Sequence, residues 1–511
     1  MDRQPMTQPA ELYACLYARE FPAQALLRLR PAMRAKPCAV LAGEPPLQEV
    51  CSGNAAARAL GVARGMTSVE VSTLPSVVVL SRSHGEEAAA KCALLECAGA
   101  FSPRIEDQSQ DTAFLGVLDI SGTERLFGPP AALAQALLGR TRELGLAACV
   151  AVCGNFHAAL CLARGMTSSN RTLVVGNGEE RDALAPLPLG VLDLPPQYGE
   201  TFSLWGIRTL GMLAALPEAP LIARMGQEGR RFRQLARGEL PHLFLPVEPA
   251  FALQEHFELD SPVEALDSLL FVVGVMLEQL MVRAGARVLA LASLTLKLSL
   301  EGGAIHTLTV KPALPNNDRK LWIKLIHLDL EAHPPDAAVL ALTLSAEPGS
   351  ISKVQLGLFS PQLPEPARLD VTLARIRAIV GEECVGRAVL KDTHGQDSVR
   401  MDPFTPFTLP AGKPADAVAL RARTAMRRLD PAEPIAVSIQ DERPQTLFFR
   451  GKRYAVLRAY GPWAASGDWW NAARWSLEQW DAIVRAGEDN LCCSLLRDPG
   501  RGTWWMAGLY D

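Results

Sequence analysis

Short apolar runs separated by amphipathic stretches dominate the first 185 residues and restrict this part of the chain to a layered fold. The runs at 12–18 (LYACLYA) and 38–41 (CAVL) flank a basic amphipathic stretch, which predicts strand, helix, strand. Further core strands are predicted at 117–120 and 148–152, with helices following at 130–144 and 157–163. This pattern is typical of a mixed α+β domain, which we expect over residues 1–185.

The pattern changes in the middle of the chain. Residues 186–245 are interrupted by Pro and Gly and predict a compact module of short helices. Residues 246–346 return to a mixed pattern and predict a second α+β domain. Its expected elements are a helix over 258–284 introduced by Asp260-Ser261-Pro262, strands at 289–300, 306–310 and 338–344, and a helix at 318–331.

The C-terminal part differs in composition. Pro, Ser and Gly are frequent over 346–370, so a linker is expected at 347–365. Seven of the nine Trp follow residue 460, within the last predicted region, 366–511. This end is either a small β-rich domain with an aromatic core or a surface for partner proteins, with stacking on single-stranded DNA as a third interpretation.

Bulk composition limits the class of protein. With 49% hydrophobic and 21% charged residues, the chain resembles a soluble globular protein. A net charge of −4 argues against a strongly basic nucleic-acid binder, so any grip on DNA must be local or supplied by a partner. No apolar run approaches the ~20 residues of a membrane span, and no secretory signal is recognisable, so a cytoplasmic protein is expected. The 11 Cys lack zinc-binding spacing and predict mostly buried core residues and no metal site.

Three stretches resemble segments of the Y-family DNA polymerases. Residues 51–66 (CSGNAAARALGVARGM) are similar to the segment in which Tyr and Arg hold the incoming triphosphate, with Arg58 in the Arg place and Ala55 in the Tyr place. Residues 101–128 resemble the palm segment from FSP through the catalytic Asp-Glu to RLFG. Residues 154–157 resemble the Asn-Lys element of the palm, with Phe156 where Lys is expected.

The resemblance implies a right-hand polymerase architecture, with palm and fingers over 1–185, a helix-hairpin-helix thumb over 186–245 and a little finger over 246–346. The tail is similar to the ImuB branch, through stretches at 368–386, 392–404, 460–470 and 504–511. For that branch the resemblance implies a catalytically degenerate mutasome subunit, cytoplasmic and nucleoid-associated. The implied partners are the bacterial sliding clamp, an error-prone DnaE-type polymerase, a RecA-like mutasome subunit and primer-template DNA.

Acid positions decide whether this resemblance includes catalysis. Phosphoryl transfer in the family needs carboxylates from two strands to hold two Mg²⁺ ions ~3.5–4 Å apart. Where the family carries Asp-x-Asp, this chain has Tyr17-Ala18-Arg19-Glu20, with Glu20 as the single acid. Where the family carries Ser-x-Asp-Glu, one alignment gives Ser109-Gln110-Asp111-Thr112 and another, anchored on Asp119, gives Phe114-Leu115.

Both alignments lose the Glu, so we expect a pseudo-polymerase without a cofactor. Glu20 and Asp111 are its degenerate acid positions. Arg58 is either a relic of nucleotide contact or a structural ion-pair partner.

A motif in the expected linker, Gln355-Leu356-Gly357-Leu358-Phe359, matches the pattern by which bacterial proteins bind the sliding clamp. Burying Leu358 and Phe359 in a pocket would each contribute ~1.5–3 kcal/mol, while the Gln355 amide would fix orientation through hydrogen bonds. A buried edge strand is the alternative interpretation.

The thumb-like segment carries two glycine turns and an arginine cluster. Its predicted DNA-binding residues are Gly206, Arg208, Gly226, Gly229, Arg230 and Arg231. Such turns bring backbone N–H groups and Arg side chains to phosphates without reading bases. Five Arg against two Glu leave residues 224–239 at +3, which supports duplex contact over the alternative of a solvated helix face.

The expected function is therefore a non-catalytic adaptor that recruits an error-prone polymerase for translesion synthesis and damage-induced mutagenesis. One alternative is an active Y-family polymerase that uses Mg²⁺ with Glu20, Asp111 and Asp119. Another is a structural subunit that binds only proteins.

Overall fold

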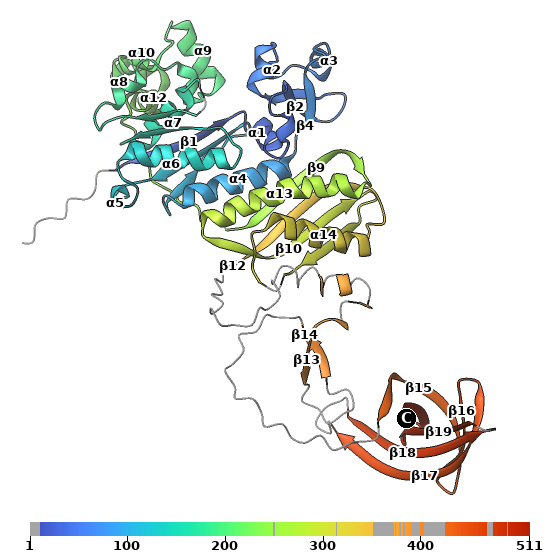
Figure 1. The fold of residues 1–511 in the computed structure, drawn as a ribbon. Helices are drawn as coiled ribbons and strands as arrows, with labels where there is room; N and C mark the ends of the chain where they lie inside the picture. The colour runs from blue at the N-terminus through green and yellow to red at the C-terminus, as the bar shows by residue number, and fades with distance from the viewer. Residues whose placement is uncertain are drawn as a thin grey trace, which may run out of the picture. The chain divides into compact units, whose positions relative to one another are not determined.

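The computed structural model divides the chain into two compact units, residues 1–378 and 379–511. It describes residues 11–350 apart from 169, 249–250 and 313, then 372–373, 375–377, 380–381, 384–390, 399–402, 425–467, 474–487 and 489–510. The first unit mixes helices and strands and the second consists largely of strands (Figure 1). The predicted α+β class and β-rich C-terminal region are confirmed.

A five-stranded sheet with the order β5-β6-β1-β7-β8 forms the centre of the first domain. Its strands are β1 (Tyr13–Arg19), β5 (Ile105–Asp107), β6 (Ala113–Asp119), β7 (Cys149–Cys153) and β8 (Thr172–Val174). Strand β1 pairs antiparallel with both β6 and β7, which explains why nearly all of its apolar run is buried. The strands predicted from the apolar runs are confirmed.

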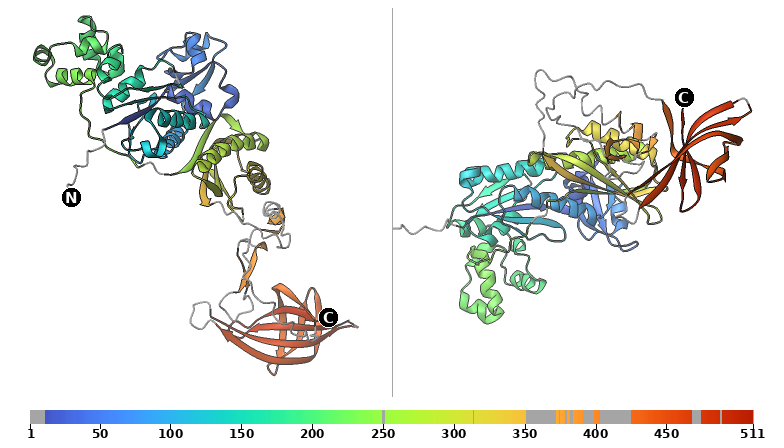
Figure 2. Two further views of the ribbon diagram at one scale, coloured as in Figure 1. Left: turned by 60° about the vertical axis from the view of Figure 1, so that its left-hand side comes forward. Right: turned by 90° about the horizontal axis from the view of Figure 1, so that it is seen from below.

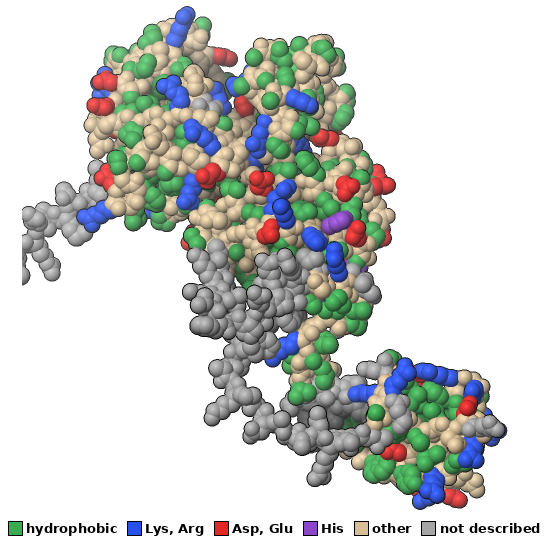
Figure 3. Space-filling model, in the orientation of Figure 1, with side chains coloured by type: hydrophobic (Ala, Val, Ile, Leu, Met, Phe, Trp, Pro, Cys, Tyr) green, Lys and Arg blue, Asp and Glu red, His purple; other side chains and the backbone are tan. Residues whose placement is uncertain are grey.

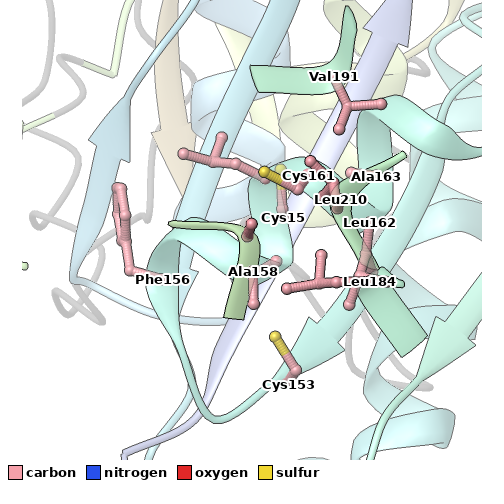
Figure 4. Close-up of a cluster of buried hydrophobic side chains, with 14 of the residues drawn as sticks. Cys15, Cys153, Phe156, Ala158, Cys161, Leu162, Ala163, Leu184, Val191 and Leu210 are labelled. Atoms are coloured by element: carbon pink, nitrogen blue, oxygen red, sulfur yellow. The ribbon is translucent and has the colours of Figure 1, made fainter. Parts of the chain in front are cut away.

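Successive side chains of β1 enter two different cores because they alternate across the strand. Leu16 and Ala18 pack on one face with α4 (His84–Gly99) and α6 (Pro130–Glu143). Cys15 packs on the other face with α7 (Phe156–Gly165), in the cluster shown in Figure 4. The predicted helices at 130–144 and 157–163 are thus confirmed as the layers that cover this sheet.

Cysteines serve mainly as small core residues, as predicted. Six of the eleven are buried: Cys15, Cys38, Cys149, Cys153, Cys161 and Cys493. Figure 4 shows Cys15, Cys153 and Cys161 among apolar side chains. Burial raises the pKa of the Cys153 thiol to about 12 and that of Cys161 to about 11, so both stay protonated and unreactive near neutral pH.

A smaller sheet with the order β3-β2-β4 follows the first helix of the chain. Its elements are α1 (Phe21–Arg28), β2 (Cys38–Ala42), β3 (Glu49–Gly53), α2 (Ala55–Ala59), α3 (Ser68–Ser72) and β4 (Val78–Ser81), and a short helix α5 (Glu124–Phe127) precedes α6. The succession β1, α1, β2 confirms the predicted strand, helix, strand.

Five short helices form the next module: α8 (Glu180–Leu184), α9 (Pro196–Leu204), α10 (Leu210–Ala214), α11 (Glu218–Met225) and α12 (Gln227–Arg237). Pro196 lies in the first turn of α9, and Gly226 and Gly238 end α11 and α12 with positive φ. Phe202 and Phe232 join the same core as α7, so the module packs against the large sheet.

A four-stranded sheet with the order β11-β10-β12-β9 forms the last part of the first unit. Its elements are β9 (Leu253–Val263), α13 (Leu266–Ala286), β10 (Leu289–Leu300), β11 (Ile305–Val310), α14 (Arg319–Ala332) and β12 (Val339–Ser350). The core between this sheet and both helices includes Leu277, Leu296 and Trp322. The predicted hairpin of 289–300 with 306–310 is confirmed.

Two expected boundaries here are wrong. Residues 258–263, predicted to begin a helix, lie in β9, and α13 begins only at Leu266 after Ala265, which makes no side-chain cap. Glu258 pairs with Ala341 and Val263 with Val339 of β12 across a register shift, so both ends of this segment are held in the sheet despite the local capping signal of Asp260-Ser261-Pro262. The predicted linker begins at 347, but residues 347–350 extend β12, where Gly349 pairs with Ala290.

Helix α13 also corrects the expectation that no stretch approaches the length of a membrane span. It is long and apolar enough by length and composition to cross a membrane. Leu269, Val273, Met276 and Leu280 are nevertheless buried in the core of this module. Its apolar character is therefore explained by packing.

The second unit contains a closed barrel of six consecutive strands, which Figure 2 shows from two further directions. These are β15 (Met426–Gln440), β16 (Arg443–Phe449), β17 (Lys452–Gly467), β18 (Trp475–Ala486), β19 (Asp489–Asp498) and β20 (Thr503–Tyr510), preceded by a hairpin of β13 (Arg387–Leu390) and β14 (Val399–Asp402). Trp480 and Trp504 lie in the barrel core with ring centroids 6.4 Å apart. Trp463 is 52% exposed, so the tryptophans both fill a core and reach the surface.

Replacing Trp480 with Ala should destabilise the barrel by ~3–5 kcal/mol, because it removes a large buried ring from a closed core. Trp463→Ala, on the exposed surface of the same barrel, should change stability by less than ~0.5 kcal/mol. Urea unfolding of the full chain, followed by the fluorescence of the barrel tryptophans, measures both. Equal losses in the two variants would contradict the assignment of Trp480 to the core.

Candidate functional site

The end of β1 and the beginning of β6 lie side by side, where the family resemblance places its catalytic acids. Tyr17 pairs with Leu115 in the strand register, and both side chains pack into the same core. On the alignment anchored on Asp119, Phe114 and Leu115 occupy the Asp and Glu places, and both are fully buried. On that alignment, apolar packing replaces the carboxylates.

Glu20 lies between β1 and α1 with a left-handed backbone, φ 53°. One carboxylate oxygen accepts hydrogen bonds from Ser52 Oγ at 2.9 Å and from the Gly53 N–H at 3.1 Å. The other accepts from Arg64 Nη2 at 3.0 Å, and Arg64 also donates to Thr112 Oγ1 at 2.7 Å. Arg64 thus bridges the acid that follows β1 and the residue that precedes β6.

Asp111 lies in the turn between β5 and β6, with 73% of its side chain exposed. Arg82 Nη2 lies 2.9 Å from its Oδ1, and Arg82 Nε lies 2.7 Å from Glu87. The hydrogen bond to Glu87 is the main cause that raises the pKa of Arg82, and the bond to Asp111 adds to it. Asp111 therefore faces a permanent cation.

Asp119, the third acid of the polymerase alternative, is at the opposite end of β6. It pairs with Tyr13 in the strand register, and its carboxylate lies 2.5 Å from Arg104 Nη1. Six residues of extended strand place its backbone ~20 Å from that of Ala113. Asp119 is too far away to share a metal ion with Glu20 or Asp111.

These donors do not fit a pair of Mg²⁺ ions. Glu20 and Asp111, the two acids at the places of the family's acids, are each paired with an arginine, and Glu87 shares Arg82 with Asp111, so the charge that would attract a divalent cation is already neutralised. In the part of the chain that the structure describes, no group of three or more His, Cys, Asp or Glu side chains is placed to hold a metal ion.

Arg58, the predicted relic of nucleotide contact, lies exposed near the end of α2, and Ala55 begins that helix. Among the described residues, no ion pair or hydrogen bond of the Arg58 side chain is found. The interpretation as a structural ion-pair partner therefore has no support in this part of the chain.

Phe156, which replaces the expected Lys, has a packing role that the sequence did not reveal. It begins α7 with 1% exposure, and its ring stacks on His242 with centroids 3.5 Å apart. His242 Nε2 lies 2.9 Å from Glu106, which also accepts the Leu245 N–H at 2.7 Å. These contacts hold the segment after α12 against Phe156, at the position where the family resemblance places a Lys.

Gly206 and Arg208 belong to the turn between α9 and α10. Gly206 has φ +72° with open space around it, and Arg208 is exposed. The turn borders an open hollow of about 450 Å³ lined by Pro188, Leu189, Gly190, Asp193, Leu194, Gly199, Ser203, Ile207 and Arg208. Both residues are accessible, which a phosphate contact requires.

Gly226, Arg230 and Arg231 are exposed at and after the turn between α11 and α12. Arg230 lies 3.3 Å from Glu218 and Arg231 lies 3.7 Å from Glu228. Because Glu218 joins the cluster, five arginines face three glutamates and the local charge is +2 instead of +3. On the face shown in Figure 3, basic and acidic side chains are likewise interspersed.

Gly229 differs from the other predicted DNA-binding residues because it is buried. A Cβ atom there would lie 2.8 Å from the backbone oxygen of Leu221. The close contact between α11 and α12 therefore explains this glycine without any ligand.

The residues predicted to bind the clamp, Gln355, Leu356, Leu358 and Phe359, lie outside the described residues, as do Trp469 and Trp470. Their prediction rests on the sequence motif.

Comparison with known proteins identifies the relatives. Residues 16–164 match the impB/mucB/samB family. Over 421 residues the chain is 25% identical to protein ImuB of Caulobacter vibrioides, covering 80% of this chain and 89% of the relative. Over 387 residues it is 26% identical to DNA polymerase IV of Moorella thermoacetica, covering 73% and 94%. The resemblance to the Y family and to ImuB is confirmed.

A crystal structure of DinB from Sulfolobus solfataricus superposes with a TM-score of 0.39 and 16% identity, over 66% of this chain and 100% of that one. A score this low supports no inference about the fold.

The histidine pair near Phe156 predicts a pH dependence of stability. Burial lowers the pKa of His157 to about 4 from 6.5, and the neighbouring His242 and Arg231 contribute to the shift, which Glu106 opposes. The unfolded chain then binds the proton more tightly, so stability should fall as the pH drops from about 6.5 towards 4. Thermal unfolding should show a weaker fall for His157→Gln than for the wild type. His84→Gln, at an 80% exposed side chain, should leave the slope unchanged, and identical slopes in all three proteins would refute the assignment.

Proposed function

We propose that this chain, similar to ImuB and carrying an impB/mucB/samB domain, is a non-catalytic Y-family homologue that recruits an error-prone polymerase for translesion synthesis and damage-induced mutagenesis. It acts while bound to the sliding clamp and to primer-template DNA. Its proposed location is the cytoplasm, in association with the nucleoid. Similarity over 80% of the chain supports the ImuB-like role.

The proposed division follows the right-hand architecture. The five-stranded sheet corresponds to the palm and the β2–β4 lobe to the fingers, within 1–185. Helices α9–α12 correspond to the thumb, within 186–245. Strands β9–β12 correspond to the little finger, proposed over 246–346, although β12 continues to Ser350. The barrel belongs to a partner-binding region, 366–511, for which the DnaE-type polymerase and the RecA-like subunit are the proposed partners.

One observation carries the non-catalytic part of the proposal: the acids that remain near the ends of β1 and β6 are paired with arginines. A metal ion would have to displace Arg64 from Glu20 and Arg82 from Asp111 before it found a carboxylate. It would then have two acids, where the family's chemistry uses three. Tyr17 and Leu115, which face each other in the register, supply no further oxygen ligand from a carboxylate.

The adaptor part of the proposal rests on sequence motifs and accessible basic residues. Gln355-Leu356-Gly357-Leu358-Phe359 supplies the contact with the clamp. Arg208, Arg230 and Arg231 are exposed and supply sequence-independent contact with phosphates. Holding the chain on the clamp raises its effective concentration at the primer terminus, where modest DNA affinity then suffices.

Primer extension tests the non-catalytic assignment. Rigorously purified full-length protein should add no nucleotides with Mg²⁺ or Mn²⁺. Incorporation that is lost in Asp111→Ala but kept in Asp336→Ala, an exposed acid of another module, would establish the active polymerase instead.

Clamp pull-down tests the adaptor assignment. The triple substitution Gln355→Ala, Leu358→Ala, Phe359→Ala should reduce capture by at least ~100-fold, because it removes both apolar anchors and the orienting amide. The matched control, Gln362→Ala with Leu363→Ala in the same segment, should bind as the wild type does. Undiminished capture of the triple variant would show that the motif is not the clamp contact.

A further inference from the structure

Six charged side chains are buried where the β9–β12 module meets α1 and α4. They are Arg28, Arg30, Glu86, Glu96, Glu255 and Arg283, and none of their side chains is more than 7% exposed. Three of these side chains are positively charged and three are negatively charged, so the formal charge of the group is zero. We call these six residues the charge lock.

Four members of the charge lock form a chain of alternating sign across the interface. Glu255 of β9 accepts hydrogen bonds from Arg28 of α1 and, at 3.1 Å, from Arg283 of α13. Arg283 also donates to Glu96 of α4 at 2.6 Å, and to the backbone oxygens of Ala252 and Gln254. Each carboxylate is thus matched to a guanidinium of another element.

The remaining pair holds the outer edge of the sheet. Strand β9 is the last strand in the order, so its outer backbone groups have no neighbouring strand. Glu86 accepts the Glu258 N–H at 3.0 Å, while Arg30 donates to the Glu258 carbonyl at 2.7 Å. Arg30 and Glu86 are themselves 2.7 Å apart. This ion pair therefore satisfies one residue of the free edge as a strand partner would.

We infer that the charge lock sets a single orientation of the β9–β12 module on the first domain, and that its members are positioning residues. Burying ions in pairs adds little strength to an interface, since their desolvation offsets their attraction. A slide or rotation that kept the interface dry would, however, leave a charge without its partner. Leu29, just after α1, packs in the core of the β9–β12 module, and such apolar contacts favour docking of the module. The charge lock then allows only one alignment of the module on the first domain.

This orientation has a consequence for the open face of the sheet. Thr295 and Lys297 of β10 and Thr309 of β11 lie on the face opposite α13 and α14, away from the buried leucines of the same strands. The charge lock fixes where this polar face stands relative to the first domain. The charge lock itself does not rest on the proposed function.

Hydrogen exchange of the full-length protein tests the inference. Glu255→Gln should speed amide exchange in β9 and α4 by about tenfold or more, because Arg28 and Arg283 then lose the buried negative charge that they share. Exchange in β10 and β12 should stay as in the wild type. Adding Arg28→Met to Glu255→Gln restores neutrality and should return exchange in α4 and β9 towards the wild-type rate. Glu264→Gln, at an exposed acid beside α13, is the matched control.

A second variant keeps the test decisive if Glu255→Gln fails to fold. The Cβ of any residue replacing Gly85 would lie 2.3 Å from the His256 ring, so Gly85→Leu places a wedge between α4 and β9 without changing charge. Gly139→Leu, where the added group meets open space, is its control. Wild-type exchange in β9 and α4 for Glu255→Gln would by itself overturn the inference, as would a double variant that exchanges faster than the single one. If Glu255→Gln does not fold, wild-type exchange for Gly85→Leu would overturn it.

Discussion

Pairing between arginine and carboxylate is the interaction on which the first unit depends. It joins Glu20 to Arg64 and Asp111 to Arg82 beside the large sheet, and it joins β9 and α13 to α1 and α4 through the charge lock. A cluster of acids at the end of a sheet repels itself unless a metal ion neutralises it. Here guanidinium groups supply that neutralisation permanently, so this part of the fold keeps its shape through protein groups alone.

Apolar side chains also pack at other positions where the family resemblance places polar or charged residues. Tyr17 and Leu115 fill the space between β1 and β6 with apolar surface, and Phe156 stacks on His242 where an expected Lys would have projected. Each of these apolar contacts stabilises the sheet and offers no side chain for catalysis. The module of short helices α8–α12 presents exposed turns and arginines, which fits the adaptor role proposed above.

Local sequence patterns predicted the helices and strands well, but they did not predict boundaries and residue roles that depend on tertiary packing. Alternation predicted the β10–β11 hairpin, apolar runs predicted β1, β6 and β7, and a β-rich domain with an aromatic core was one of three interpretations of the late tryptophans. The helix expected from residue 258 begins at Leu266, because Glu258 and Val263 both pair with β12 and hold the two ends of this segment in the sheet. Gly229, expected at DNA, lies in a helix contact, since a glycine in a turn and one in a close crossing look alike in sequence.

By itself, the sequence determined the α+β class, the order of the elements, which residues stand at the places of the family's acids, and the presence of a clamp-like motif, because each is a matter of residue type along the chain. Tertiary structure alone decided what took the place of the acids and how the modules face one another. Arg64 lies 44 residues from Glu20, and Arg283 lies 187 residues from Glu96. No periodicity or motif links charges at such separations. Their pairing follows from burial, which makes an ion without a partner too costly to keep.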